Sequence, residues 1–199
     1  MTQKLNAWLR RVPVWALWLI GLVPLALVVW DTLHGTLGVD PVKAIEHRLG
    51  RTALYFLVAG LAVTPLLRFG RINLMRFRRA LGLLAFTYAA LHLASWVVLD
   101  MGLLWSQMLR DVAKRPYLIF GALAFVMLLA LAVTSNNASI RRLGRKWRSL
   151  HKLVYLAVPL VVIHWQWALK VWEAAPIFWG GLTVLLLLLR LVPRSVRGR

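Results

Sequence analysis

The sequence predicts an all-α membrane protein: a single domain, residues 1–199, folded as a bundle of six transmembrane helices with both termini in the cytoplasm. Three observations predict this fold class. The 199 residues are 61% hydrophobic, which is more than an ordinary soluble domain contains. Apolar segments of membrane-spanning length recur along the whole chain. The 25 Lys and Arg and the 6 Asp and Glu fall mostly between those segments.

Six segments each supply the roughly 20 apolar residues that a helix needs to cross a hydrocarbon core about 30 Å thick. The expected spans are 12–30, 50–67, 80–99, 116–134, 150–169 and 175–192. Tryptophan and tyrosine residues near several of these limits are typical of an interfacial aromatic belt. The stretch 31–49 is expected to form a structured outer loop with glycine and proline turns.

The first span has the charge order of a signal peptide, because Lys4, Arg10 and Arg11 precede its apolar stretch. That stretch is too long for a signal peptide, however, and no A-x-A cleavage site precedes Asp31. We therefore expect an uncleaved first transmembrane helix.

The charged residues predict the orientation of the bundle. Segment 68–79 carries five Arg, segment 135–149 carries four Arg and one Lys, and the tail from Arg190 carries four Arg. These segments contain no acid, and all six acids lie in the three alternate loops. The positive-inside rule then predicts that both termini lie in the cytoplasm. Because the cations lie between spans and not on one folded face, nucleic acid is not an expected partner; anionic membrane lipid is.

The absence of cysteine excludes several kinds of metal site. Disulfides, thiolate zinc sites, iron–sulfur clusters and covalent c-type haem all need cysteine, and the chain has none. A metal centre in this protein would therefore depend on histidine.

Two histidines lie deep in apolar spans, where an ionisable group is costly and indicates a functional site. His92 lies about 3 Å and His164 about 7 Å outward of their span centres, a match within the uncertainty of the span limits. Two imidazoles at one depth on different helices predict a non-covalent b-type haem with both axial positions filled, which suits electron transfer. The structural alternative is that each histidine forms a hydrogen bond with a neighbouring helix.

His151 lies about 19 Å from His164 along an ideal helix and about 140° away in azimuth, near the cytoplasmic surface. It could bind a second, inner haem, contact a haem propionate, or lie at the membrane edge. The position on span three that would supply a matching inner ligand is occupied by Arg78, which cannot ligate iron. A second bis-histidine haem is therefore unsupported. Pro159 makes a bend between the two histidines plausible.

The sequence indicates the roles of the remaining histidines and cations less specifically. His34 and His47, close to Arg48 and Arg51 in the sequence, could hold haem propionates or a quinone headgroup, or lie in a solvated loop. The inner loops could bind lipid headgroups, an acidic cytosolic donor or the phosphate of a flavin. No glycine-rich phosphate-binding fingerprint follows a strand, so no built-in nucleotide domain is expected.

Several segments together resemble the MsrQ (YedZ) family of haem-binding membrane subunits, within the ferric-reductase-like transmembrane superfamily. The most specific is LGRKWRSLHKLVYL (143–156). The others are HGTLGVDPVKAIEHRLGRTAL (34–54), TPL (64–66), RRALGL (78–83), LHLASW (91–96), RPYL (115–118) and LAVTS (131–135).

The resemblance implies an inner-membrane b-type cytochrome that passes electrons to MsrP, a periplasmic molybdenum enzyme that reduces methionine sulfoxide in oxidised proteins. It implies a quinone-pool donor or a cytosolic flavin reductase, and FMN beside haem. The family's haem histidines match His92, His151 and His164. In the wider superfamily, spans three and five each supply two histidines, whereas this chain has only the outer one on span three.

The working hypothesis is an electron-transfer subunit of an oxidoreductase complex, without catalytic residues of its own. A transmembrane ferric reductase that acts on external iron chelates is the first alternative. A small proton-coupled transporter that uses the membrane histidines as a relay is the second, although its spans lack acidic partners. A membrane anchor for a partner needs no buried histidine and ranks below both.

Overall fold

The computed structural model describes residues 2–169 and 171–192, and this part of the chain is helical without a strand, as the sequence predicts. The α-helices are α1 (Thr2–Arg11), α2 (Val14–Leu33), α3 (Pro41–Phe69), α4 (Arg78–Ser95), α5 (Trp105–Lys114), α6 (Pro116–Val133), α7 (Asn137–Leu143), α8 (Arg145–Leu150), α9 (Val154–Ala168) and α10 (Ala174–Leu191). Three short segments differ in winding: the 3₁₀ turns η1 (Met75–Phe77) and η3 (His151–Leu153), and the π-helical η2 (Trp96–Asp100).

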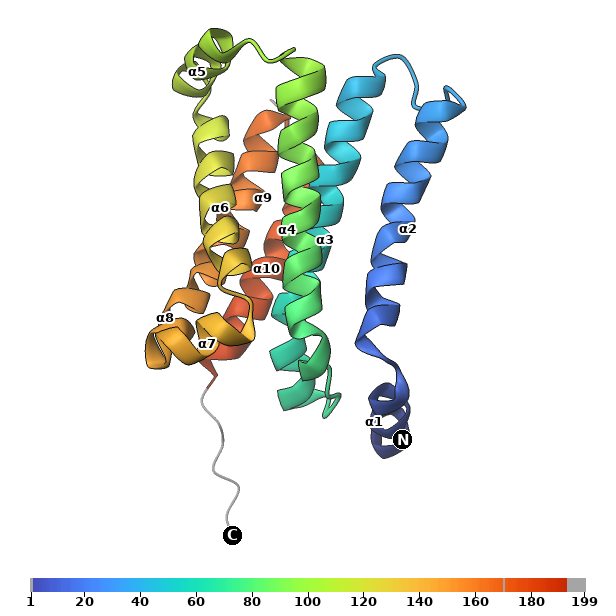
Figure 1. Cartoon of the computed structure of the whole chain (residues 1–199), viewed down its shortest axis with the longest axis vertical. Coiled ribbons are helices and arrows are strands. Elements are labelled where there is room, and N and C mark those ends of the chain that lie inside the picture. The colour runs from blue at the N-terminus through green and yellow to red at the C-terminus, as the bar shows by residue number, and fades with distance from the viewer. Residues whose placement is uncertain (1, 170, 193–199) are drawn as a thin grey trace.

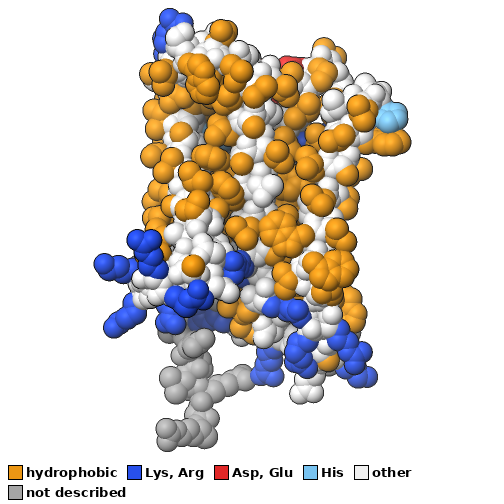
Figure 2. Space-filling model, in the orientation of Figure 1, with side chains coloured by type: hydrophobic (Ala, Val, Ile, Leu, Met, Phe, Trp, Pro, Cys, Tyr) orange, Lys and Arg blue, Asp and Glu red, His pale blue; other side chains and the backbone are white. Residues whose placement is uncertain are grey.

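Six helices form an upright bundle. Helix α3 packs against α4 and α10, α6 packs against α4 and α9, and α2 packs against α3 and α4 (Figure 1). Helix α5 lies at the upper end, and α1, α7 and α8 lie at the lower end. Lys and Arg side chains gather at that lower end, below a broad apolar surface (Figure 2). This pattern matches a protein surrounded by lipid along its middle.

Within residues 2–169 and 171–192, five helical segments are long and apolar enough to cross a membrane: α2, α3, Met75–Asp100 around α4, α6 and α10. The expected span 150–169 is instead divided, because residues 151–153 wind as the 3₁₀ turn η3 and α9 starts at Val154. With 15 residues, α9 is about 22 Å long, which is shorter than a hydrocarbon core.

The expected outer loop 31–49 is wrong in detail, because its second half belongs to α3. Helix α3 begins at Pro41, nine residues before the predicted start of the second span. Asp40 explains the early start: its carboxylate accepts a hydrogen bond from the Lys43 amide at 3.0 Å, and Pro41 occupies the first helical turn, where its missing N–H costs nothing. The loop proper therefore covers only residues 34–40.

The core lies along the faces that α3, α4, α6, α9 and α10 turn toward one another. Its buried residues are Leu54, Leu57, Val58, Leu61, Ala85, Leu128, Leu131, Ala157, Val158 and Leu186. All are aliphatic. The small side chains of Ala85 and Ala157 let the helix backbones approach closely.

Tyr88 of α4, in a second buried cluster with Leu49 and Ala53, forms hydrogen bonds to the backbone of α2. The Tyr88 hydroxyl donates a hydrogen bond to the Gly21 carbonyl at 2.6 Å and accepts one from the Leu25 amide at 3.0 Å. Residues 21 and 25 would otherwise pair with each other in the helix, so the hydroxyl takes the place of one backbone hydrogen bond next to Pro24.

Proline also opens a backbone position in α3. Pro65 has no N–H, so the Leu61 carbonyl loses its helical donor. The Arg190 guanidinium of α10 replaces it, with Nη2 donating to the Leu61 carbonyl at 2.6 Å and Nη1 donating to the Tyr155 hydroxyl at 2.6 Å. A basic side chain thus supplies the missing hydrogen bond of a backbone carbonyl inside the bundle, near its lower end.

Candidate functional site

The two histidines expected on spans three and five meet inside the bundle. His92 lies on α4 and His164 on α9, with ring centroids 6.2 Å apart and ring planes at 72°. Both residues are half-buried. We call these residues the histidine pair. Their proximity agrees with the matched depths read from the sequence.

Each imidazole of the histidine pair is held by a backbone carbonyl of an adjacent helix. His92 Nδ1 lies 2.9 Å from the Glu46 carbonyl of α3, and His164 Nδ1 lies 2.8 Å from the Tyr117 carbonyl of α6. A carbonyl oxygen only accepts, so Nδ1 carries the proton and donates in both cases. Each Nε2 therefore keeps a free lone pair, the arrangement in which histidine ligates a metal.

The spacing of the histidine pair fits two axial ligands of one metal ion. An imidazole nitrogen ligates a first-row metal at about 2.0–2.1 Å and its ring centre lies roughly 1.1 Å further away, so two opposed rings have centroids about 6.3 Å apart. The observed 6.2 Å agrees with that value. The centroid separation is therefore compatible with a haem iron between the two rings.

The set of nearby ligands argues against a closed metal cage. Within residues 2–169 and 171–192, no group of three or more His, Cys, Asp and Glu side chains is arranged to hold a metal ion. A structural zinc site needs four such ligands, whereas a haem iron needs only two axial ligands from the protein.

His151 does not join the histidine pair. Its Nε2 lies 3.2 Å from the Thr134 hydroxyl at the end of α6, and its ring stacks on Trp147 with centroids 3.9 Å apart. Trp147 in turn donates its indole N–H to the Thr134 carbonyl at 2.9 Å. His151 is therefore engaged by α6 and α8 at the lower end of the bundle.

Two arginines accompany His151 at that end. Arg78 at the start of α4 is close enough for its charge to act on both His151 and Arg190. The Arg190 Nε is buried and has no hydrogen-bond partner among the described residues. We call Arg78, His151 and Arg190 the lower cationic cluster. A buried, unpaired donor among like charges is the environment that an anionic group would stabilise.

The upper histidines are less engaged in the bundle. The His34 ring stacks on the Trp30 ring with centroids 3.9 Å apart, and His34 Nδ1 lies 2.8 Å from the Trp30 carbonyl. His34 is therefore an exposed C-cap residue of α2. His47 is exposed on α3. Of the two readings offered for His34 and His47, their exposure agrees with the solvated one.

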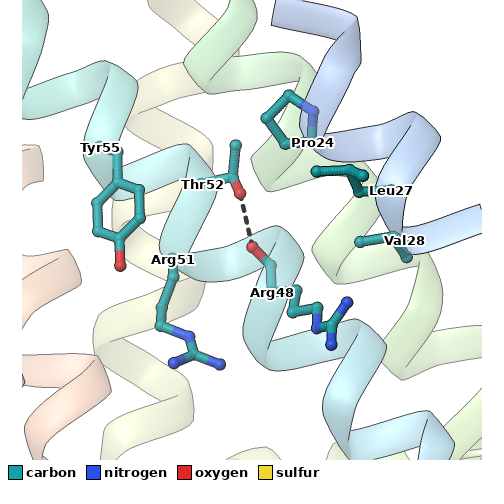
Figure 3. A pocket seen from close by; sticks show the side chains of 7 residues that line it. All are labelled: Pro24, Leu27, Val28, Arg48, Arg51, Thr52 and Tyr55. Atoms are coloured by element: carbon teal, nitrogen blue, oxygen red, sulfur yellow. Dashed lines mark hydrogen bonds between the residues drawn. The ribbon is translucent and has the colours of Figure 1, made fainter. Parts of the chain in front are cut away.

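Two arginines of α3 instead face a pocket between α2 and α3. Arg48 forms an ion pair with Asp31 of α2, and Arg51 donates from Nε to the His47 carbonyl at 3.1 Å. The pocket has a volume of about 220 Å³ (Figure 3). Its lining combines the apolar residues Pro24, Leu27 and Val28 with Arg48, Arg51, Thr52 and Tyr55.

A second ionic group joins α3 to the end of span three. Lys43 lies 3.1 Å from Asp100 and 3.6 Å from the buried carboxylate of Glu46. Glu46 is the residue whose carbonyl holds His92. This charge group therefore helps to fix the turn of α3 that positions one imidazole.

The sequence gives the histidines but not their carbonyl partners. Glu46 and Tyr117 act through backbone atoms, so the identity of their side chains carries no signal for this role. Only the contacts of α3 with α4 and of α6 with α9 identify them.

Comparisons with known proteins agree with this geometry. A protein-family model described as "Ferric reductase like transmembrane component" matches residues 49–162, a range that includes His92 and His151 and ends two residues before His164. A Brucella anthropi protein named "Protein-methionine-sulfoxide reductase heme-binding subunit MsrQ" is 46% identical over 186 residues, or 94% of this chain and 84% of its own length. Proteins of the same name from Brucella ovis and Brucella canis are 45% identical over 188 residues, or 93% of this chain and 86% of theirs. The chain therefore belongs to the MsrQ family of haem-binding membrane subunits, among the ferric reductase-like transmembrane proteins.

Proposed function

We propose that this protein is a b-type cytochrome that carries electrons across the bacterial inner membrane to a periplasmic, molybdenum-dependent protein-methionine-sulfoxide reductase, MsrP. The observation that carries the proposal is the histidine pair, whose 6.2 Å separation suits one bis-histidine iron. The name of the relatives, a haem-binding subunit of a protein-methionine-sulfoxide reductase, supports the reaction to which the electrons go. Oxidised periplasmic proteins would be the final substrates.

His92 and His164 are the proposed axial ligands. When bound, haem supplies one-electron chemistry by cycling between ferric and ferrous iron. The two Nε2 atoms would hold the iron, while each Nδ1 keeps its proton and donates it in a hydrogen bond to a backbone carbonyl. Because the chain has no cysteine, the haem is bound non-covalently.

The lower cationic cluster is the proposed entry side for electrons. Arg78, His151 and the unpaired Arg190 Nε suit an anionic group such as the phosphate of FMN. A quinol or a cytosolic flavin reductase would be the donor. Arg78 in place of a histidine argues against a second bis-histidine haem here, and His151 retains Thr134 as a partner.

The proposed topology has six spans, including α9, with the termini and the basic lower end in the cytoplasm. The acid-free segments 68–79 and 135–149 support this orientation by the positive-inside rule. Arg194, Arg197 and Arg199 of the basic tail lie outside the described residues.

Deletion of the gene tests the proposed pathway against its main alternative, ferric reduction, which the family-model match favours as a second candidate. We expect loss of methionine sulfoxide repair in periplasmic proteins while reduction of external iron chelates is unchanged. Complementation with a His92→Ala variant should fail. Intact repair in the deletion strain, with impaired iron reduction, would favour the ferric reductase.

A further inference from the structure

The two imidazoles of the histidine pair are held by the same local arrangement on two different helices. The accepting carbonyl belongs to Glu46 on α3 and to Tyr117 on α6. In each helix the residue four positions later is a glycine, Gly50 and Gly121. Both glycines face the imidazole that their helix holds.

Helix geometry explains why the fourth residue matters. The carbonyl of residue i accepts the amide of residue i+4, and the Cβ of residue i+4 leans back toward the N-terminus, over that carbonyl. A side chain there would occupy the space through which a second donor reaches the oxygen. Glycine leaves the space open, so the carbonyl can use its second lone pair for an imidazole.

The contact distances show how closely the rings fill this space. A Cβ at position 121 would lie 2.8 Å from His164 Nδ1 and 2.9 Å from its Cε1. A Cβ at position 50 would lie 3.2 Å from His92 Nδ1 and 3.4 Å from its Cε1. Alanine at 121 would therefore force the ring to move, and alanine at 50 would press on it less strongly.

We propose that Gly50 and Gly121 are positioning residues that set the strength of the Nδ1–H···O=C bonds of His92 and His164, and through them the reduction potential of the haem. A stronger bond gives the imidazole more anionic character and stabilises ferric iron. A lengthened bond therefore makes the potential more positive. This inference rests on the proposed ligation of haem by the two histidines.

The test compares Gly50→Ala and Gly121→Ala with the wild type and with Gly82→Ala as a matched control. Gly82 lies on α4, the helix of His92, but a Cβ there would meet nothing within 4 Å. Each protein is purified, and its haem content, its ferric low-spin electron paramagnetic resonance spectrum and its midpoint potential are measured.

We expect shifted g values and a more positive potential in both test variants, larger in Gly121→Ala, with the wild-type values in Gly82→Ala. If Gly121→Ala is purified without haem, Gly50→Ala decides by the same spectrum. Wild-type g values and potentials in the haem-loaded test variants would overturn the inference, and so would an equal shift in Gly82→Ala. A wild-type protein without haem would overturn the proposed function instead.

Discussion

At the scale of single residues, the histidine pair depends on what each Nδ1 contacts. The Glu46 and Tyr117 carbonyls fix the tautomer and orientation of His92 and His164 without contributing any charged side chain. Because the partners are backbone atoms, substitution of the Glu46 or Tyr117 side chain does not remove the accepting oxygen. Substitutions that change the space beside the imidazole rings, in contrast, act directly on His92 and His164.

Tyr88 offers a residue-scale test of the packing of α2. Its hydroxyl bridges the Gly21 carbonyl and the Leu25 amide, so Tyr88→Phe removes two hydrogen bonds between α4 and α2. We expect the free energy of unfolding to fall by about 1–3 kcal/mol, measured as thermal stability in detergent. Tyr55→Phe, at an exposed position of α3, is the control and should change stability little. Equal stability of the two variants would rule out the bridging role.

His151 provides a second residue-scale prediction. Because it contacts Thr134 and Trp147 and not the histidine pair, His151→Ala should retain the haem and its spectrum. We expect slower haem reduction by a reduced flavin donor, measured by stopped-flow absorbance, because the lower cationic cluster would lose one member. Loss of haem in this variant would instead assign His151 as an iron ligand.

The meeting of His92 and His164 is predictable from sequence because depth in the membrane follows from residue counting. Their carbonyl partners are not, because these depend on how each helix is rotated about its axis. His151 illustrates the same limit: the sequence locates it near the lower end, but its stacking on Trp147 depends on the 3₁₀ turn η3.

At the scale of helices, the Asp40 cap stabilises the start of α3, the helix whose Glu46 carbonyl holds His92. Asp40→Ala removes the carboxylate that accepts from the Lys43 amide and should lower stability by about 0.5–2 kcal/mol. Asp40→Asn keeps a capping oxygen and should retain most of the stability. Thermal unfolding in detergent measures both, and equal losses would show that the cap contributes little.

The contact between α10 and the proline break in α3 can be tested by a double-mutant cycle. Arg190→Leu leaves the Leu61 carbonyl without a donor and should cost about 1–3 kcal/mol. Pro65→Ala restores a helical N–H for that carbonyl, so Arg190→Leu should cost less in the Pro65→Ala background. Additive losses in unfolding experiments would contradict the proposed exchange of donors.

Hydropathy predicted where helices cross the membrane, but not the helices at their ends. The amphipathic α1 and α5 and the short α7 lie outside the apolar segments, and the early start of α3 depends on a cap and not on hydropathy. The shortened α9 was also missed, because a 3₁₀ turn leaves no mark in an apolar run.

At the scale of the whole molecule, orientation is directly testable because the chain has no cysteine. Single cysteines are introduced at exposed sites, Ser106→Cys on α5 and Ala138→Cys on α7. With a membrane-impermeant maleimide, we expect labelling of position 106 in intact spheroplasts and of position 138 only after lysis. The reverse pattern would invert the proposed topology.

The central claim is that one iron is held between His92 and His164, and haem content with the low-spin ferric spectrum tests it most directly. The measurement compares the wild type with His92→Ala, His164→Ala and, as a control, His34→Ala. We predict one non-covalent haem b with bis-histidine ligation in the wild type and in His34→Ala, and loss of that signal in the other two. A wild-type spectrum in either His92→Ala or His164→Ala would contradict the account.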